Sequence, residues 1–256
     1  MKLSVLMLTH DRLSLASKCV PFILDNLNGI EHEVLVWDNC SNDGMLDWLI
    51  EYKKREGKIN RIYCSDKNYG VEAINYMVQD ATGEYILKID DDISPPELFA
   101  KRMVDAFEKF NNPKLAYLGF DMRWGKTTFA TRSGMKLYRP PMGSATTLRG
   151  GDKILVNFNP SRWMINGACR LSKRSTFIEL GGHPPGCMYG VDYTVSKAAA
   201  DAGYWIGYLS SKRNVEHLGT STIVEKNFKH RELKKAVKVH VQGWVQTKTE
   251  HNCTYA

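Results

Sequence analysis

The stretch EYILKIDDDISPPELF, residues 84–99, begins as a short apolar run and then meets three consecutive aspartates, Asp90, Asp91 and Asp92. Its apolar part, residues 84–89, has the length and composition of a buried strand. The Ser-Pro-Pro-Glu that starts at residue 94 has the pattern of a helix start, with a serine N-cap and a glutamate three residues later. The aspartates are therefore predicted on a short connection between a buried strand and a capped helix.

The same type of strand recurs along the first half of the chain. Segments of helical spacing alternate with three more short apolar runs, residues 2–8, 31–37 and 59–64. Strands that alternate with helices are typical of βαβ units, which form parallel sheets. We therefore predict an α/β fold with a Rossmann-like, mainly parallel sheet flanked by helices.

Polar loops follow each of these strands. Because such sheets bind ligands at the carboxyl ends of their strands, we expect four loops to line one edge: residues 9–12, 38–43, 66–70 and 90–92. Three adjacent carboxylates repel one another, so one of them takes up a proton unless a cation is near. A hard divalent ion, Mn²⁺ or Mg²⁺, would remove this conflict and bridge to substrate phosphates. The alternative is a solvated acidic turn that favours the following helix N-terminus.

Asp38 follows the second strand directly. At such a place a carboxylate can accept hydrogen bonds from a ribose hydroxyl or from the N–H of a base. The sequence DNCSNDG, residues 38–44, also suits an Asx-type turn, in which the carboxylate bonds to its own loop. For this loop taken alone, the turn is the better interpretation.

Together these loops resemble the nucleotide-sugar-binding half of a GT-A glycosyltransferase of the family 2 type. The resemblance covers residues 3–98 and is carried by SVLMLTHDR (4–12), VLVWDNCSNDG (34–44) and NYGVEAINYMVQDATGEYILKIDDD (68–92). It implies a divalent metal held by Asp90 and Asp92. It also implies that six loop residues bind the nucleotide-sugar donor: Thr9, Arg12, Asp38, Asn68, Asp90 and Asp91.

The second half resembles the same family in three shorter segments, GACRLSKRSTFIELGG (167–182), YGVDYTVSKAAADAGY (189–204) and VEHLGTST (215–222). The second of these implies that Asp192 is the catalytic base, although Val191 and Thr194 stand where the family usually has acids. The third implies that His217 completes the metal site. A lone histidine is otherwise more often a structural or surface residue.

The resemblance implies sugar transfer from a nucleoside-diphosphate sugar, most simply a UDP-sugar, to an acceptor hydroxyl with inversion. Two other classes of protein share the layout: a sugar nucleotidyltransferase, and a nucleotide-sugar-binding module without catalysis. The sequence THDRLSL lacks the Gly-rich phosphate loop expected of the nucleotidyltransferase. A Rossmann dehydrogenase is disfavoured because no G-x-G-x-x-G follows a predicted strand.

Charge is divided unevenly along the chain. Residues 1–120 hold 14 Lys+Arg and 19 Asp+Glu, whereas residues 121–256 hold 21 and 9. We predict one domain with a donor-binding half (1–120), an acceptor-side half that carries the base (121–220), and a basic C-terminal helix and tail (221–256). The excess of positive charge in residues 121–256 has two interpretations. It either serves solubility and neutralises the donor diphosphate, or it binds a polyanionic acceptor, which would be a nucleic acid, a glycan or a glycolipid.

The composition also bears on location. The six cysteines show no CxxC pair, and no run approaches the roughly 18 apolar residues of a membrane helix. The apolar start is interrupted at His10, unlike an export signal. We therefore expect reduced thiols and a cytoplasmic protein, peripheral at a membrane surface if the acceptor is a glycolipid. The sequence leaves the oligomeric state open.

Overall fold

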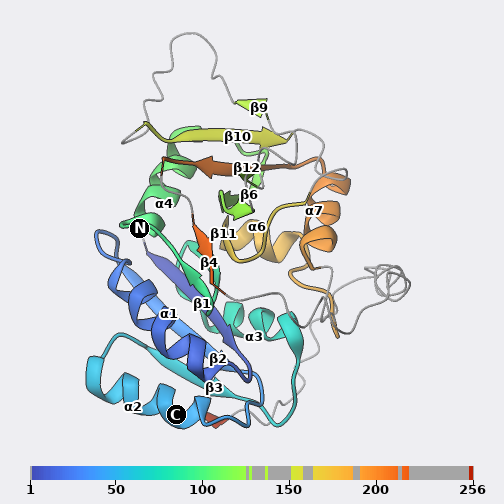
Figure 1. Cartoon of the computed structure of the whole chain (residues 1–256). Helices are drawn as coiled ribbons and strands as arrows, with labels where there is room; N and C mark the ends of the chain where they lie inside the picture. Colours follow the sequence, from blue (N-terminus) through green and yellow to red (C-terminus); the bar gives the residue numbers. More distant parts are fainter. Residues whose placement is uncertain are drawn as a thin grey trace.

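The computed structural model describes residues 2–124, 127–128, 136–137, 151–157, 164–186, 191–212, 215–218 and 254–255. Its centre is a ten-stranded sheet with the order β14-β3-β2-β1-β4-β11-β6-β12-β10-β9 (Figure 1). Seven of these strands, β1, β2, β3, β4, β6, β9 and β12, point in one direction. The prediction of a mainly parallel α/β sheet flanked by helices is confirmed.

The first half is built of βαβ units, as the sequence predicts. Its strands are β1 (Leu3–Thr9), β2 (His32–Asp38), β3 (Arg61–Cys64) and β4 (Tyr85–Asp90), all in parallel pairs. The helices between them are α1 (Leu13–Asp25), α2 (Met45–Glu56) and α3 (Ala73–Asp80), the last preceded by the short 3₁₀ helix η1 (Gly70–Glu72). Parallel pairing brings the carboxyl ends of these strands to one edge.

The second half continues the sheet less regularly. It contributes β6 (Leu115–Phe120), β9 (Lys136–Leu137), β10 (Lys153–Asn157), β11 (Cys169–Lys173) and β12 (Trp205–Ser210), and β14 (Thr254–Tyr255) pairs with β3. Strand β11 lies antiparallel between β4 and β6 and separates the two parallel parts of the sheet. A two-stranded pair, β7 (Arg123–Trp124) with β8 (Thr127–Thr128), follows β6. The predicted basic helix near the C-terminus lies outside the described residues.

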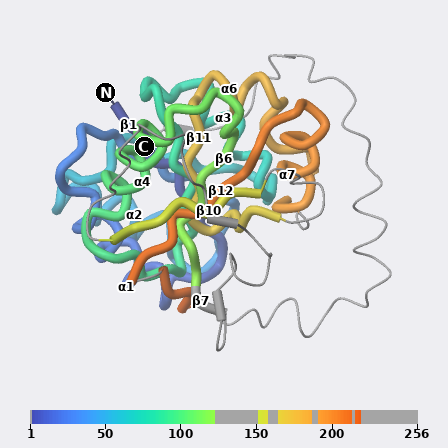
Figure 2. The backbone as a smooth tube through the Cα atoms, turned by 90° about the horizontal axis from the view of Figure 1, so that it is seen from above, coloured from blue at the N-terminus to red at the C-terminus, as the bar shows by residue number. Residues whose placement is uncertain are grey.

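Two apolar cores cover the two faces of the sheet. Strand β1 alternates between them, since Val5 and Met7 belong to one core and Leu6 to the other. Helices α1, α2 and α4 (Phe99–Phe110) pack on the first face, and α3, α6 (Arg174–Glu179) and α7 (Val191–Asp201) on the second (Figure 1). Viewed from above, β10 and β12 run side by side near α7 (Figure 2). The strands whose ends carry the site residues are thus held between two helical layers.

The predicted capping box at residue 94 is wrong. Ser94 belongs to β5 (Ile93–Ser94), which pairs with β13 (Glu216–His217). Helix α4 begins only at Phe99, after Leu98 in a left-handed conformation. Because the backbone of Ser94 is extended and bonded to a partner strand, its side chain is not placed to cap a helix. The aspartates therefore connect two strands.

Among the residues that the structure describes, no helix is both long enough and apolar enough to cross a membrane.

Candidate active site

The polar ends of β1, β2 and β4 meet at one edge of the sheet. Thr9 and Asp38 are the last residues of their strands and are paired in register, and Asp90 ends β4 opposite Leu8. The edge that the sequence predicts is therefore formed. The functional roles of these residues stay predictions.

Asp38 is almost fully buried and is bonded within its own loop. Its carboxylate accepts hydrogen bonds from the Thr9 hydroxyl (3.2 Å), from the Ser41 backbone N–H (3.3 Å) and from the Ser41 hydroxyl. This is the Asx-type arrangement that the loop composition suggests. Asp38 therefore shapes the loop after β2. A ligand that bound to the Asp38 carboxylate would have to share it with these loop contacts.

Hydrogen bonds join the loop after β1 to the loop after β2. The Asn42 N–H donates to Asp11 Oδ1 (2.7 Å), and the Leu13 N–H at the start of α1 donates to Asp43 Oδ2 (2.7 Å). Arg12, the N-cap of α1, makes no side-chain cap bond of its own, so Asp43 caps the helix from the neighbouring loop. We call this pair of contacts the loop clasp. It fixes the backbone on both sides of Arg12.

Arg12 reaches across to the aspartates. Its Nη1 lies 2.6 Å from Asp92 Oδ2 and its Nη2 lies 2.8 Å from Asp91 Oδ1. The two carboxylates are only 2% and 1% exposed, whereas the arginine side chain is 42% exposed. Burial raises the pKa of Asp91 to about 7, although the nearby guanidinium opposes this. The sequence predicts a metal ion as the cation beside these carboxylates, and the structure places an arginine there as well.

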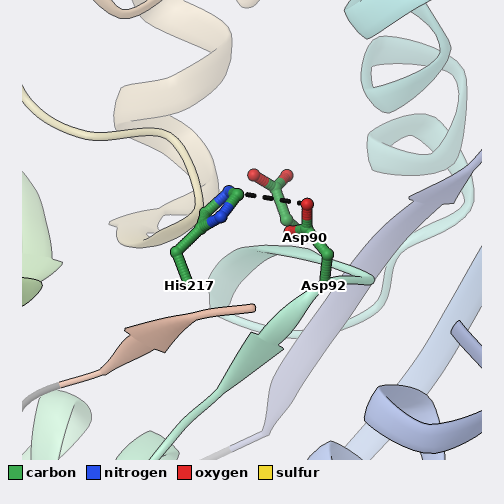
Figure 3. Close-up of side chains that lie close together, drawn as sticks. All are labelled: Asp90, Asp92 and His217. Atoms are coloured by element: carbon green, nitrogen blue, oxygen red, sulfur yellow. Dashed lines mark ion pairs between the residues drawn. The ribbon is translucent and has the colours of Figure 1, made fainter. Parts of the chain in front are cut away.

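Asp90, Asp92 and His217 form a trio whose ligand atoms all lie within 4.8 Å of one another. The pairing of β13 with β5 brings His217 to this place, and the Leu218 N–H donates to the Asp92 carbonyl (2.8 Å). Figure 3 shows the three side chains pointing toward one another, with His217 Nε2 3.5 Å from Asp92 Oδ2. Asp92 Oδ1 is buried without a hydrogen-bond partner among the described residues. Two carboxylates and an imidazole with a spare buried oxygen fit a divalent cation.

Asn68, a predicted donor-binding residue, lies in the loop after β3. Its Oδ1 accepts the Gly70 N–H (2.7 Å), which shapes a local turn. The buried Asn39, which the sequence reasoning missed, joins this loop to the one after β2. Its Oδ1 accepts the Tyr69 N–H (2.8 Å) and its Nδ2 donates to the Gly70 carbonyl (3.0 Å). An asparagine directly after a strand-end aspartate was the available signal.

Asp192, the predicted base, lies in the first turn of α7 with its carboxylate against Gly167. A Cβ atom on Gly167 would lie 2.5 Å from Asp192 Oδ1, so no other residue fits there without displacing the carboxylate. Burial raises the pKa of Asp192, while Arg170 and Lys88 lower it and the Gly167 N–H donates to the carboxylate. Helix α7 is held in place by Ser196, whose hydroxyl accepts the Ile165 N–H (2.9 Å).

Two buried basic side chains, Lys88 and Arg170, lie near this carboxylate, and the buried His183 lies against Arg170; the sequence reasoning missed all three. We call Lys88, Arg170, His183 and Asp192 the inner cluster. Lys88 Nζ forms an ion pair with Asp90, and Arg170 Nη2 lies 3.2 Å from His183 Nε2. The backbone of His183 is held by Asn75 through bonds of 2.8 and 2.9 Å. The one available signal was a lysine inside an otherwise apolar strand, two residues before Asp90.

The model of the protein family described as glycosyl transferase family 2 matches residues 4–181, more than half of the chain. A curated relative, the glycosyltransferase TuaG of Bacillus subtilis (strain 168), is named for teichuronic acid biosynthesis. It is 32% identical over 60 residues, which are 23% of this chain and 24% of TuaG.

Solved structures show the same fold. Residues 1–349 of TarS from S. aureus, in complex with UDP-GlcNAc, match 92% of this chain with a TM-score of 0.67 and 16% identity. The mannosyltransferase PcManGT from Pyrobaculum calidifontis, in complex with GDP-Man and Mn²⁺, matches 82% with a TM-score of 0.56 and 18% identity. The chain spans 64% of that TarS fragment and 56% of PcManGT.

Proposed function

The chain belongs to glycosyl transferase family 2, and on this premise we propose that it transfers a sugar from a nucleoside-diphosphate sugar to an acceptor hydroxyl with inversion. The observation that carries the proposal is the convergence of His217, from β13, with Asp90 and Asp92, which lie at the connection between β4 and β5 and are far from His217 in sequence. UDP-sugars are the first donors to test, because the TarS fragment was solved with UDP-GlcNAc.

The donor side uses the edge of the first four strands. A divalent ion, Mn²⁺ or Mg²⁺, held by Asp90, Asp92 and His217 would supply Lewis-acid stabilisation of the diphosphate leaving group. Arg12, which is partly exposed beside the aspartates, adds a positive charge for the same phosphates. Thr9, Asp38, Asn68 and Asp91 line the nucleoside side of this edge in the proposal.

Asp192 is the proposed general base. Its carboxylate accepts the proton of the acceptor hydroxyl as that oxygen attacks the anomeric carbon. Burial raises the pKa of Asp192 and makes it a stronger base than an exposed aspartate, while Arg170 and Lys88 oppose this effect and favour the charged form. Attack from the face opposite the leaving diphosphate gives inversion.

We place the acceptor on the side of the second half, and we propose an acidic glycan. Two facts support this choice: residues 121–256 hold 21 Lys+Arg against 9 Asp+Glu, and TuaG is named for the synthesis of teichuronic acid. The division into a donor-binding half, an acceptor-side half and a basic tail belongs to the same proposal. Nucleic acid and anionic lipid are the competing acceptors.

The test begins with donor turnover. The purified chain is incubated with UDP-GlcNAc, other UDP-sugars and GDP-Man in the presence of Mn²⁺, Mg²⁺ or EDTA, and release of the nucleoside diphosphate is followed. Metal-dependent release that Asp192→Asn abolishes is the expected result. Tight binding of a nucleotide sugar without any release would instead indicate a binding module.

The acceptor is tested by binding at about 50 to 200 mM salt, a range over which polyanion contacts weaken steeply. The probes are an acidic glycan, duplex DNA, single-stranded DNA and anionic lipid vesicles. Salt-sensitive binding to the glycan alone is expected. Binding to none of them would contradict an anionic acceptor and leave donor transfer intact.

A further inference from the structure

Lys88 lies between the donor side and the acceptor side of the site. It is 8% exposed on β4, and its ammonium forms an ion pair with Asp90. If Gly167 carried a Cβ atom, that atom would lie 3.8 Å from Lys88 Nζ and 2.5 Å from Asp192 Oδ1. The Lys88 ammonium and the Asp192 carboxylate therefore both lie against Gly167.

The setting of this lysine is costly for the fold. Lys88 and Arg170 are paired in register on β4 and β11, and Arg170 is 3% exposed. Like charges on directly opposite residues destabilise a sheet, and buried ion pairs are often replaced by apolar residues without loss of stability. Two cations kept at this place beside Asp90 and Asp192 point to a role other than stability.

We propose that Lys88 is a positioning residue of the transfer reaction, whose ammonium holds the carboxylates of Asp90 and Asp192 at a fixed separation so that donor and acceptor face each other. The inference rests on the proposed function, because it takes Asp192 as the base. Lys88 touches neither sugar nor phosphate in this proposal. It acts through the two carboxylates.

The proposal has a consequence for pH. The groups that face Asp192 are Arg170 on β11, Lys88 and Asp90 on β4, the Gly167 N–H and the Tyr208 hydroxyl on β12. Lys88 lowers the pKa of Asp192 against the effect of burial, so its removal raises that pKa. The acidic limb of the pH–rate profile then moves to higher pH. A side chain that only filled space would leave this limb in place.

The experiment compares Lys88→Met, which keeps the length and removes the charge, with Lys88→Arg, which keeps the charge. Lys54→Met, at an exposed position of α2, is the control. Three quantities are measured: UDP affinity with Mn²⁺ by calorimetry, kcat and KM for UDP-GlcNAc hydrolysis as a function of pH, and the pKa of Asp192 from its ¹³Cγ resonance, assigned with Asp192→Asn.

For Lys88→Met we expect a kcat lowered by about tenfold or more, an acidic limb shifted upward, and a loss of Mn²⁺-dependent UDP affinity that is smaller than the loss of kcat, because Asp92 and His217 remain to hold the metal. Lys88→Arg restores much of the loss. Wild-type kcat in Lys88→Met, or equal loss in both variants together with lost UDP binding, would overturn the proposal.

Failure of the base assignment gives a different result. If Asp192→Asn keeps full turnover, Asp192 is not the base, and the role of Lys88 falls with it. If Asp192→Asn is inactive and Lys88→Met is fully active, only the inference about Lys88 fails. The ¹³C titration reports on the link between Lys88 and Asp192 without any turnover.

Discussion

The site joins two groups of charges that are held in different ways. On the proposed donor side, Asp91 and Asp92 both form ion pairs with Arg12, which comes from a loop and is 42% exposed. In the inner cluster, Asp192 is flanked by Lys88 and Arg170, which stand on strands and are almost fully buried. A cation on a loop can be exchanged when a charged ligand arrives, whereas cations on central strands stay in place. If the proposed function is right, the donor side adapts to its ligand and the acceptor side is preorganised.

The largest effect is expected from the donor side. Asp92→Ala removes a proposed metal ligand and should lower donor turnover about 10³-fold, since Lewis-acid stabilisation is worth several kcal/mol and each 1.36 kcal/mol is tenfold in rate. Mn²⁺-dependent UDP binding should vanish in calorimetry. Asp105→Asn, in a helical ion pair with Lys101, is the control and should behave as wild type. Unchanged metal-dependent affinity in Asp92→Ala would refute the metal site.

The second largest effect is expected in the inner cluster, and it distinguishes this cluster from the proposed donor side. Asp192→Asn should lower kcat by about 10²-fold or more while UDP affinity stays near that of wild type, because a base acts on the acceptor and not on the donor. Steady-state kinetics and calorimetry on one preparation measure both. Asp201→Asn, at the exposed end of α7, is the matched control. A parallel loss of UDP binding would mean that Asp192 belongs to the donor side.

A third effect concerns the pH dependence of stability without metal. The pKa of Asp91 is raised from 3.8 to about 7, so the folded protein binds more protons than the unfolded chain between these values. Its free energy of unfolding should therefore fall as pH rises from about 4 to 7. Asp91→Asn should be more stable than wild type by about 4 kcal/mol at pH 7 and within about 1 kcal/mol of it near pH 4.

Urea unfolding of both proteins in EDTA at several pH values measures this difference. A constant difference between the two proteins at every pH would contradict the raised pKa of Asp91.

The smallest effect tests the loop clasp that holds Arg12. Asp43→Ala removes the cap of α1 and should lower the free energy of unfolding by about 1 kcal/mol, the usual value of an N-cap. UDP affinity should weaken modestly, because Arg12 is less well placed. Asp43→Asn keeps an acceptor oxygen and should lose less of both. Equal stability of the alanine variant and wild type would show that the clasp contributes nothing.

The strands and the strand-end residues, which depend on local sequence pattern, could be predicted from the sequence. Apolar periodicity located β1 to β4, and the rule that sites lie at strand ends located Thr9, Asp38 and Asp90. The trio with His217 was predicted through family resemblance, and the structure brings the three side chains together.

Features that depend on contacts between segments far apart in the sequence could not be predicted. The inner cluster exists because β11 pairs with β4 in one particular register, and no local pattern sets that register. The capping prediction failed for the same reason, since Ser94 is engaged by β13, a strand more than a hundred residues later. The loop clasp likewise joins two loops about 30 residues apart.

The position of β11 also has a consequence for the time course of synthesis. Strand β4 is complete at residue 90, but its second neighbour in the sheet ends at Lys173. A ribosome that adds about 5–20 residues per second takes roughly 4–17 s to proceed from the end of β4 to the end of β11. During that interval the nascent chain exposes an open edge of β4, which is a template for pairing with other chains. Slower translation of residues 121–168 therefore lengthens the period in which this protein is most exposed to aggregation.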